Sequence, residues 1–432
     1  MHRHISYKTL YIALAVVTCG AVASCASDAP ELTEDSNVIV FACPEITLGG
    51  VEVASRGQML QTLPENERFG VIAYCIPLTL RGTDAKNTNH VDYLGGESDW
   101  VVKKSTIHPG LIRSNGDVDM LMQPIMYDGT KCVYSDGTTS GFSHPVHWLE
   151  KSEVGAADPS DMSYTFIAYH PYSADWGKFE LMDGNTAYDA SNSANAYNVK
   201  GAPRLRYTSP YQRDAANVHD MTRELDPELA KDAMVAVTYN RVRAAGAIPL
   251  KFDHIQSGIR FQINNMSADK ELKISNLSIS GTFYDSAIWD FSEADPRITV
   301  NSENVYSGYF PFVKAASPMT VPRNRAMVPG TDADHEWGTT VLLLPDLDFD
   351  ATNVEEKDHC YLGRNKVIHV TYAFDGDADK SVDIPFTLGR VPEMGKLYTL
   401  NLNFIGNQIL LMFTADATEY WQSGCNSDII IN

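Results

Sequence analysis

The sequence has little positive charge, and it contains none of the short motifs that mark the common enzyme classes. Lys and Arg number 34 against 55 Asp and Glu, which gives a formal net charge of −21 at pH 7. An acidic surface of this kind repels the phosphates of nucleic acid, so no nucleic-acid partner is expected. The chain also lacks a Gly-x-Ser-x-Gly elbow, a His-Glu-x-x-His motif and a glycine-rich phosphate loop. No cofactor is expected. An enzyme stays a third alternative only because a catalytic carboxylate pair leaves no local mark in a sequence.

Cysteine is present, but in no pattern that binds metal. Five of the seven cysteines lie beyond residue 25, and no two are spaced as Cys-x-x-Cys. The spacings fit no zinc pattern, so no metal site is expected. A disulfide is open to an exported chain, but the spacing selects no pair, and we expect most of these thiols to be buried as small hydrophobes. The five are Cys43, Cys75, Cys132, Cys360 and Cys425.

The apolar stretch near the start is too short to cross a bilayer. Residues 10–23 form a run of 14 apolar or small residues, whereas a membrane helix needs about 20. The run follows a positively charged start that contains Arg3 and Lys8, and small residues come after it. This order is typical of a secretory signal peptide.

Cys25 stands where a bacterial lipoprotein would be cleaved and lipidated. The apolar and small residues 22–24 before it fit a lipobox, in which the cysteine thiol accepts diacylglycerol and the amine is acylated after cleavage. We therefore expect residues 1–24 to be a lipoprotein signal peptide. Ala26 follows instead of Asp, so nothing suggests retention in the inner membrane, and we expect an outer-membrane lipid anchor. The alternatives are cleavage before Cys19 and an ordinary signal peptide with a chance cysteine.

Beyond an acidic segment at residues 25–37, which we expect to be a flexible tether, the pattern is that of β-strands almost throughout. Residues 366–374 alternate apolar and polar, as in a strand with one buried face. Residues 272–281 shift phase midway, which suggests a β-bulge. Other short runs, rich in branched and aromatic residues, predict strands buried in a sandwich. They are 38–48, 70–78 and 164–172.

The sequence predicts an all-β fold of two antiparallel Greek-key β-sandwich domains with little helix. A composition change near 241–247 separates an N-terminal domain, residues 38–243, from a C-terminal domain, residues 244–432. Residues 184–217 are rich in Asn, Ala, Ser and Tyr with little periodicity, so we expect a long loop there. Helical signal is confined to one or two turns at 226–234.

Several acidic and histidine motifs have the spacing of metal ligands but lack a complete set. Two runs place carboxylates at alternate positions, as an EF-hand loop does, but neither has the Gly and Glu that complete such a loop. Acidic turns between strands explain both. His144 and His147 have no further ligand nearby in the sequence, and His254 begins an apolar strand, where a structural role is expected. The two runs are Asp346, Asp348 and Asp350, and Asp375, Asp377 and Asp379.

Four stretches in order resemble the fimbrillin-like family, which comprises type V pilus subunits and related surface lipoproteins of Gram-negative anaerobes. They are "RFGVIAY" (68–74), "YTFIAYHPY" (164–172), "KDAMVAVT" (231–238) followed by "IPLKFDHIQSGIRFQI" (248–263), and "PEMGKLYTLNLNF" (392–404). The resemblance implies transthyretin-like sandwich domains and assembly by donor-strand exchange, in which a strand from one subunit completes the sheet of another. Partners would be other pilus subunits or copies of this chain.

The resemblance also implies that a protease removes the first strand by cutting after an arginine. Arg56 follows the strand predicted at 38–48 and is the first Arg or Lys beyond Cys25. An ordinary loop arginine is the alternative. The terminal run Ile429, Ile430 and Ile431 is apolar and β-branched, which suits a donor strand; alternatively, it pairs within its own domain.

We therefore expect a non-enzymatic surface lipoprotein of the outer membrane: a shaft, tip or anchor subunit of a fimbrium, or a pilus-associated adhesin for a host or bacterial ligand. A carbohydrate-binding lipoprotein of a glycan-uptake system is the alternative. Sugar binding would require aromatic platforms, such as Trp100, Trp148 or Trp176, aligned on one face.

The lipid anchor is tested by Cys25→Ala. Because only a cysteine thiol accepts the diacylglycerol, the variant should take up no labelled palmitate and should accumulate unprocessed or leave the membrane fraction. Metabolic labelling followed by fractionation measures this, with Cys19→Ala as the control. Labelling that persists without Cys25 would contradict the assignment.

Overall fold

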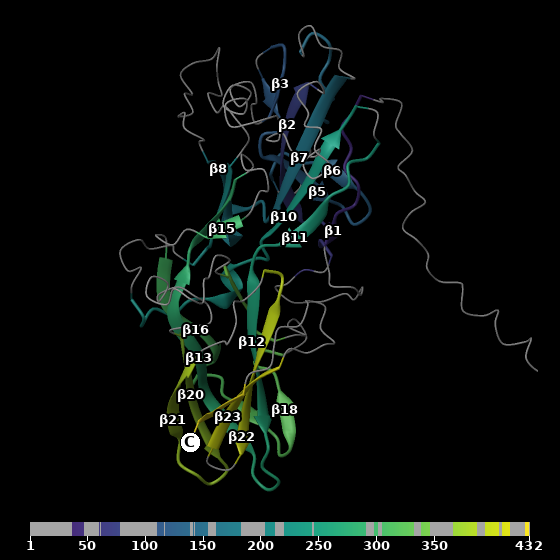
Figure 1. Cartoon of the computed structure of the whole chain (residues 1–432). Helices are drawn as coiled ribbons and strands as arrows, with labels where there is room; N and C mark the ends of the chain where they lie inside the picture. Colours follow the sequence, from purple (N-terminus) through teal and green to yellow (C-terminus); the bar gives the residue numbers. More distant parts are fainter. Residues whose placement is uncertain are drawn as a thin grey trace, which may run out of the picture. The chain divides into compact units, whose positions relative to one another are not determined.

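The computed structural model describes the greater part of the chain beyond residue 36. The described residues are 37–46, 60, 62–77, 110–115, 117–138, 141, 143–153, 161–182, 204–211, 220–243, 246–290, 298–300, 305–331, 338–345, 366–386, 394–405, 408–414 and 428–431. The chain divides into two units, residues 1–38 and 39–432. All of the sheets belong to the second unit (Figure 1).

Strands dominate the described residues, which confirms the predicted all-β class. No helix among them is long and apolar enough to cross a membrane. The helical turns described are the 3₁₀ turns η3 (Ala174–Trp176) and η5 (Pro227–Leu229). The second falls where the sequence predicted one or two turns.

Residues 45–254 contribute a seven-stranded sheet and a small hairpin. The sheet has the order β1-β11-β10-β7-β2-β5-β6. Its strands are β1 (Glu45–Ile46), β11 (Lys251–His254), β10 (Met234–Arg241), β7 (Met162–His170), β2 (Arg68–Pro77), β5 (Gln123–Tyr127) and β6 (Cys132–Tyr134). The hairpin is β3 (Leu111–Ile112) with β4 (Val118–Asp119).

β2 and β7 are covered on both faces, and all nine residues of β7 are buried. Since side chains alternate across a strand, two separate cores result. Phe166 and Ala168 point into one core, and Ile167 and Tyr169 into the other. This two-sided burial explains why both segments read as continuous apolar runs.

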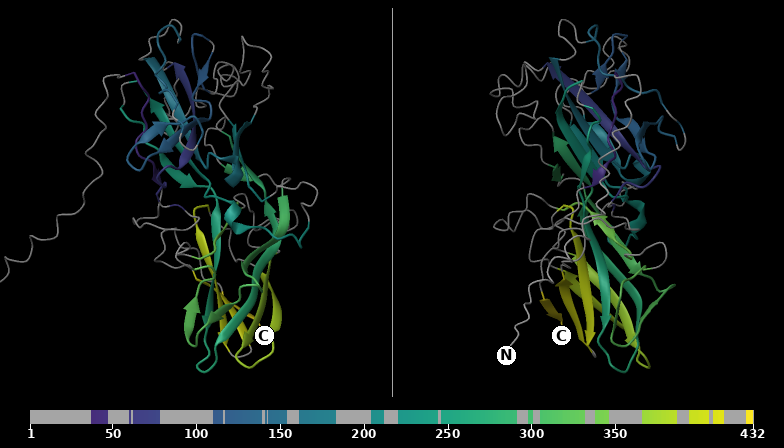
Figure 2. Two further views of the ribbon diagram at one scale, coloured as in Figure 1. Left: turned by 180° about the vertical axis from the view of Figure 1, so that it is seen from behind. Right: turned by 90° about the vertical axis from the view of Figure 1, so that its right-hand side faces the viewer.

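The second half builds two sheets that pack face to face (Figure 2). Phe261 and Phe312, from opposite sheets, meet edge to face with ring centroids 4.6 Å apart, and Tyr372 and Phe404 meet at 4.9 Å. One sheet contains β16 (Val305–Val313), β13 (Leu272–Tyr284), β20 (Lys366–Phe374), β21 (Lys380–Phe386) and β17 (Met319–Val321). The other contains β18 (Arg325–Met327), β12 (Ser257–Asn265), β22 (Leu397–Ile405), β23 (Gln408–Thr414), β24 (Asp428–Ile431) and β19 (Val341–Leu343).

These two sheets confirm local sequence signals and add one exception to the antiparallel expectation. β20 alternates buried and half-buried residues over its first six positions, as predicted. β13 shifts register between Ile274 and Asn276, where a bulge was expected. β12 and β22, however, pair in parallel from Gly258↔Leu397 onward. A parallel pair needs a long connection, and the chain passes through the whole opposite sheet between them.

A further four-stranded sheet takes strands from both sides of residues 241–247. Its order is β15 (Ile298–Val300), β14 (Ser286–Asp290), β9 (Arg204–Thr208) and β8 (Lys178–Met182). It packs on the second face of the seven-stranded sheet, where the rings of Tyr169 and Phe179 lie 5.0 Å apart. The division into two sandwich domains at residues 243/244 stays a prediction.

The loop predicted over 184–217 was wrong at β9. Leu205 and Tyr207 are buried against the second core, whereas Arg204 and Arg206 are only half-buried. The alternation spans only five residues between polar stretches, too short to stand out from the surrounding composition. Residues 184–203 and 212–217 lie outside the described residues.

Asp285 carries a buried carboxylate at the point where the chain leaves β13 and enters β14. The carboxylate accepts a hydrogen bond from Ser209 Oγ at 3.2 Å. Burial raises the pKa of Asp285 from 3.8 to about 6, although the Ser209 hydrogen bond and the charge of Arg206 lower it. The folded protein therefore holds this proton more tightly than the unfolded chain. This proton binding adds to the free energy of unfolding below about pH 4, and the contribution is lost as the pH rises through 6.

Asp285→Asn should remove this pH dependence, because an amide keeps the shape and the acceptor without ionising. At pH 7 we expect the variant to be more stable than the unsubstituted protein by about 1–3 kcal/mol, with no difference near pH 4. Urea unfolding between pH 4 and 7 measures this. Asp253→Asn, at an exposed position of β11, is the control; equal pH dependence with and without Asp285 would contradict the argument.

Candidate functional site

Residues 39–46, here called the edge segment, run beside residues 248–252 at one end of the seven-stranded sheet. The Ala42 amide donates to Ile248 O, and the Ile248 amide donates to Val40 O, each at 2.8 Å. The Glu45 amide donates to Leu250 O, also at 2.8 Å. The direction is parallel.

Regular pairing in the edge segment is shorter than the strand predicted at 38–48. Within the described part of the edge segment, regular strand is confined to Glu45 and Ile46, which form β1. Phe41 makes an isolated bridge with Ile248. Pro44 has no amide hydrogen and therefore breaks the ladder. The segment is held by a few spaced backbone hydrogen bonds instead of a continuous ladder.

Two side chains anchor the edge segment in the first core. Ile39 is fully buried and Phe41 is 4% exposed. The Phe41 ring meets Phe166 of β7 edge to face, with centroids 5.7 Å apart, and lies 6.5 Å from the ring of Tyr134. Burying a large apolar side chain contributes about 1.5–3 kcal/mol, so these two residues hold the segment at least as firmly as its hydrogen bonds do.

The edge segment also touches β6, which ends the same sheet on its other side. Tyr134 Oη donates to Ile39 O at 2.7 Å, and Cys132 Sγ donates to Ala42 O at 3.3 Å. Burial raises the pKa of the Tyr134 phenol well above its ordinary value, so this donor stays protonated. The sheet curls until its two ends approach, and the edge segment fills the space between them, bonded by backbone to 248–250 and by side chains to β6.

A buried polar cluster fixes the chain where it is next described after the edge segment. The Leu60 amide donates to Asp232 Oδ2 at 2.7 Å, and Asp232 also accepts from His254 Nδ1. Both side chains are almost fully buried, in keeping with the structural role expected of His254. Leu60 is therefore tied to the strands that flank the edge segment.

Glu67 extends this cluster toward β7. Its carboxylate lies 3.2 Å from His170 Nε2 and accepts from Lys231 Nζ at 2.9 Å. Burial alone would raise the pKa of Glu67, but the hydrogen bonds and charges of His170 and Lys231 lower it, to about 2. This ion pair therefore loses its stabilising effect only when the pH falls from about 4.5 toward 2.

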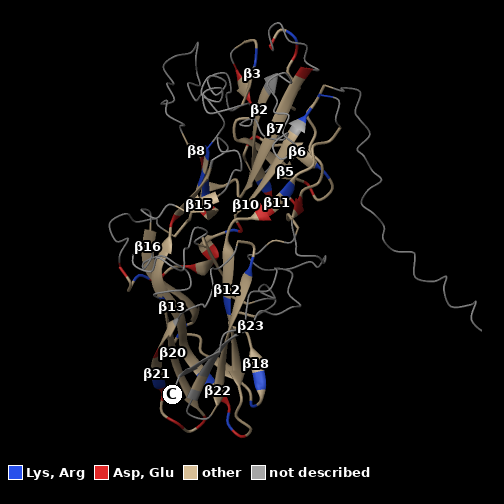
Figure 3. Ribbon diagram, viewed as in Figure 1, with Lys and Arg blue, Asp and Glu red and all other residues tan. Residues whose placement is uncertain are grey.

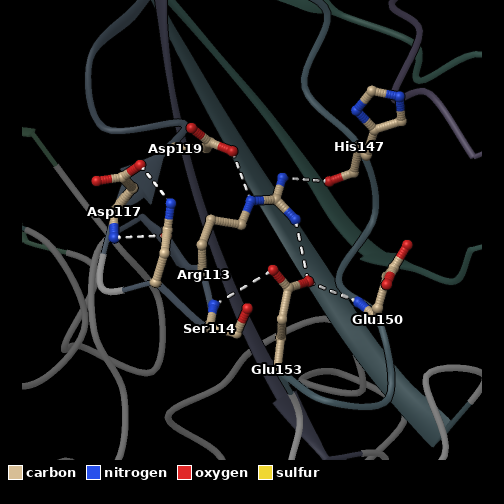
Figure 4. A network of polar contacts seen from close by, with 8 residues as sticks. Arg113, Ser114, Asp117, Asp119, His147, Glu150 and Glu153 are labelled. Atoms are coloured by element: carbon tan, nitrogen blue, oxygen red, sulfur yellow. Dashed lines mark hydrogen bonds and ion pairs between the residues drawn. The ribbon is translucent and has the colours of Figure 1, made fainter.

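The histidine pair predicted from sequence is not brought together with further ligands among the described residues. His144 is exposed. His147 offers its backbone carbonyl to Arg113 at 2.6 Å, and its ring points away from the nearby carboxylates (Figure 4). Arg113 also pairs with Asp119 and Glu153. The guanidinium compensates these acids, and the network joins the β3–β4 hairpin to residues 147–153.

The other predicted residues fall in three groups. Asp375, Asp377 and Asp379 lie in the exposed turn between β20 and β21, as expected of an acidic turn. Ile429, Ile430 and Ile431 form part of β24, which pairs antiparallel with β23 of the same chain. The rest lie outside the described residues: Cys25, Arg56, Trp100, Asp346, Asp348, Asp350, Cys360 and Cys425.

The surface features of the described residues do not favour a sugar platform. Trp148 is 2% exposed and packs edge to face on Tyr164, so it cannot stack on a ligand. Trp176 is 36% exposed, with Lys231 Nζ 5.3 Å from its ring centroid. Over the described residues, Lys and Arg are scattered among Asp and Glu (Figure 3).

No protein-family model matches the chain, and no curated protein matches it. Among solved structures, a presumed cell adhesion protein from Bacteroides uniformis has a TM-score of 0.38 at 10% identity, over 92% of this chain and 99% of that chain. A second, from Bacteroides ovatus, has a TM-score of 0.35 at 10% identity, over 91% and 98%. The tip fimbrial protein Mfa3 from Porphyromonas gingivalis, with a C-terminal truncation, has a TM-score of 0.26 at 9% identity, over 81% and 94%.

The anchoring of the edge segment is tested by Phe41→Ala. Loss of a buried phenyl ring costs about 3–5 kcal/mol, which is comparable with the total of about 1.5–4.5 kcal/mol that three backbone hydrogen bonds supply. The segment should therefore open locally, and the Ala42 and Glu45 amides should exchange with deuterium at least tenfold faster, by mass spectrometry or NMR. Val40→Ala, at a half-buried neighbouring position, should change the rate little. Unchanged protection in Phe41→Ala would contradict this anchoring role.

Proposed function

We propose that this chain is a non-enzymatic, fimbrillin-like surface lipoprotein that serves as a type V pilus subunit or pilus-associated adhesin and is assembled by donor-strand exchange. The proposal rests on the loose pairing of the edge segment at the end of its sheet. The segment is an N-terminal, loosely paired element that closes a sheet and fills a core, and Arg56 follows it in the sequence. The motifs that resemble the fimbrillin-like family, and the adhesin and fimbrial neighbours, agree with such a role.

The energetics of the edge segment favour replacement over simple loss. Without it, the backbone groups of Ile248 and Leu250 lose their partners, and the space of Ile39 and Phe41 opens in the core. An unpaired sheet edge beside an apolar space binds another strand readily. Each restored hydrogen bond contributes about 0.5–1.5 kcal/mol, and each buried large side chain about 1.5–3 kcal/mol. A strand from a neighbouring subunit that supplied both would be held durably.

The proposed donor is the terminal segment of a partner subunit. Among the described strands, β24 ends its sheet and pairs with β23 alone. Ile429, Ile430 and Ile431 must therefore leave β23 before they can fill the sheet of another copy. A terminal edge strand loses only one ladder when it leaves, which makes this exchange less costly than the release of a central strand.

The proposed location is the outer surface of the outer membrane, with attachment through lipid on Cys25. Cleavage after Arg56 would separate the lipidated residues 25–56 from the rest of the chain. The uncut protein would then be a membrane-bound precursor, and the cut protein an assembling subunit that binds other subunits and a host or bacterial surface ligand.

Assembly is tested with the purified lipoprotein, an arginine-specific protease and dithiothreitol, which keeps the cysteines reduced. We expect cleavage at Arg56 followed by ladders of detergent-resistant oligomers, because exposed sheet edges then capture strands. Arg56→Ala should abolish both, measured by gel electrophoresis without boiling and by N-terminal sequencing.

Arg323→Ala, which removes an exposed turn arginine, is the matched control and should behave as the unsubstituted protein. A monomer that persists in dithiothreitol after complete cleavage at Arg56 would exclude a polymerising subunit.

A further inference from the structure

Two cysteine thiols contact each other's neighbouring backbone where the edge segment passes β6. Cys43, which is exposed, donates to Thr130 O at 3.0 Å, and Cys132, which is half-buried, donates to Ala42 O at 3.3 Å. The Ala42 carbonyl belongs to the peptide bond that joins Ala42 to Cys43. Thr130 lies two residues before Cys132. Each thiol therefore reaches the backbone beside the other cysteine, although 89 positions separate the two in sequence (132 − 43).

The electrostatics of the pair agree with this proximity. Burial raises the pKa of the Cys132 thiol far above its ordinary value, and a negative charge on Cys43 raises it further. Cys75 differs in position: it lies on β2, and β5 stands between β2 and β6 in the sheet. Cys75 is half-buried, as Cys132 is, so it serves as a matched control for the pair.

We propose that Cys43 and Cys132 form a disulfide in the exported protein, which fastens the edge segment covalently to β6. A disulfide requires Cα atoms roughly 4.4–6.8 Å apart. The reciprocal contacts bring each thiol to a backbone carbonyl within two residues of the other cysteine, so bond formation requires both side chains to turn from these carbonyls toward each other. Export supplies the oxidising surroundings in which such a bond persists.

The oxidant is a disulfide of the exporting compartment, carried by a small molecule or by a thiol–disulfide oxidoreductase. The exposed Cys43 loses its proton and its thiolate attacks one sulfur of the oxidant, forming a mixed disulfide and releasing one thiol. Cys132 then loses its proton and attacks Cys43 Sγ, which releases the second thiol. The protein gives up two electrons and two protons, and the oxidant disulfide is reduced to two thiols.

If the proposed function holds, the disulfide makes release of the edge segment depend on reduction. Arg56 lies between Cys43 and Cys132 in the sequence. When the disulfide is closed, cleavage after Arg56 leaves residues 25–56 attached to the body of the subunit. Only the reduced protein releases its edge segment, so the disulfide would prevent premature strand exchange.

Disulfide mapping tests the bond directly. The full-length protein is taken from the cell envelope, its thiols are blocked with iodoacetamide, and its peptides are analysed by mass spectrometry without reduction. We expect a Cys43 peptide linked to a Cys132 peptide. Cys43→Ser should lose this species, and Cys75→Ser should keep it. The proposal is overturned if both thiols are alkylated, or if either is linked to Cys360 or Cys425.

Cleavage tests the consequence. After treatment with the arginine-specific protease, the N-terminal fragment should stay with the body on a non-reducing gel and separate with dithiothreitol. In Cys43→Ser it should separate without reductant. A fragment that leaves the unreduced, unsubstituted protein overturns the lock. If Arg56 is never cut, the proposed function fails while the mapped bond stands; if oligomers form and no bond is mapped, only the bond fails.

Discussion

Burial of β2 and β7 on both faces is the constraint on which the rest of the architecture depends. A strand that carries apolar side chains on both faces needs a cover on each side of its sheet. On one side the sheet curls, and the edge segment fills the remaining space with Ile39 and Phe41. On the other side a four-stranded sheet supplies Phe179 and Tyr207. Each cover includes chain that is distant in sequence from β7: the edge segment on one side, and β14 and β15 on the other.

These two covers differ in how firmly they are built. The four-stranded sheet interleaves β8 and β9 with β14 and β15, so it joins both halves of the chain through continuous ladders. The edge segment contributes two regular strand residues and a few spaced hydrogen bonds. Local stability follows contact density and hydrogen bonding. The element best suited to exchange is therefore also the one that closes the first core.

The edge segment combines backbone pairing, apolar anchoring and a cysteine contact within a few residues. Its backbone pairs with 248–250, its apolar side chains enter the core, and Cys43 reaches the backbone of the β5–β6 turn. Charged networks lie elsewhere: Arg113 compensates Asp119 and Glu153, and Lys231 and His170 compensate Glu67. Both networks join neighbouring elements, and their acidic and basic groups compensate one another.

Much of the fold could be predicted because local patterns report local burial. The alternation in 366–374, the phase shift in 272–281 and the continuous runs of β2 and β7 each reflect which faces of a strand are covered. β9 escaped prediction because five alternating residues inside a polar stretch carry too little signal. The parallel pairing of β12 with β22 escaped as well, since strand order depends on contacts far apart in sequence.

The sequence by itself determined the all-β class, the candidate lipid anchor at Cys25, the candidate cleavage residue Arg56 and the acidic turn at 375–379, because each rests on composition or on neighbouring residues. Only the tertiary structure decided that the edge segment lies between the two ends of one sheet, that Trp148 is buried, and that Cys43 and Cys132 are neighbours. The physical reason is that hydrophobic burial specifies which side chains leave water, but not which distant segments cover them; that choice is made by the packing of the whole chain.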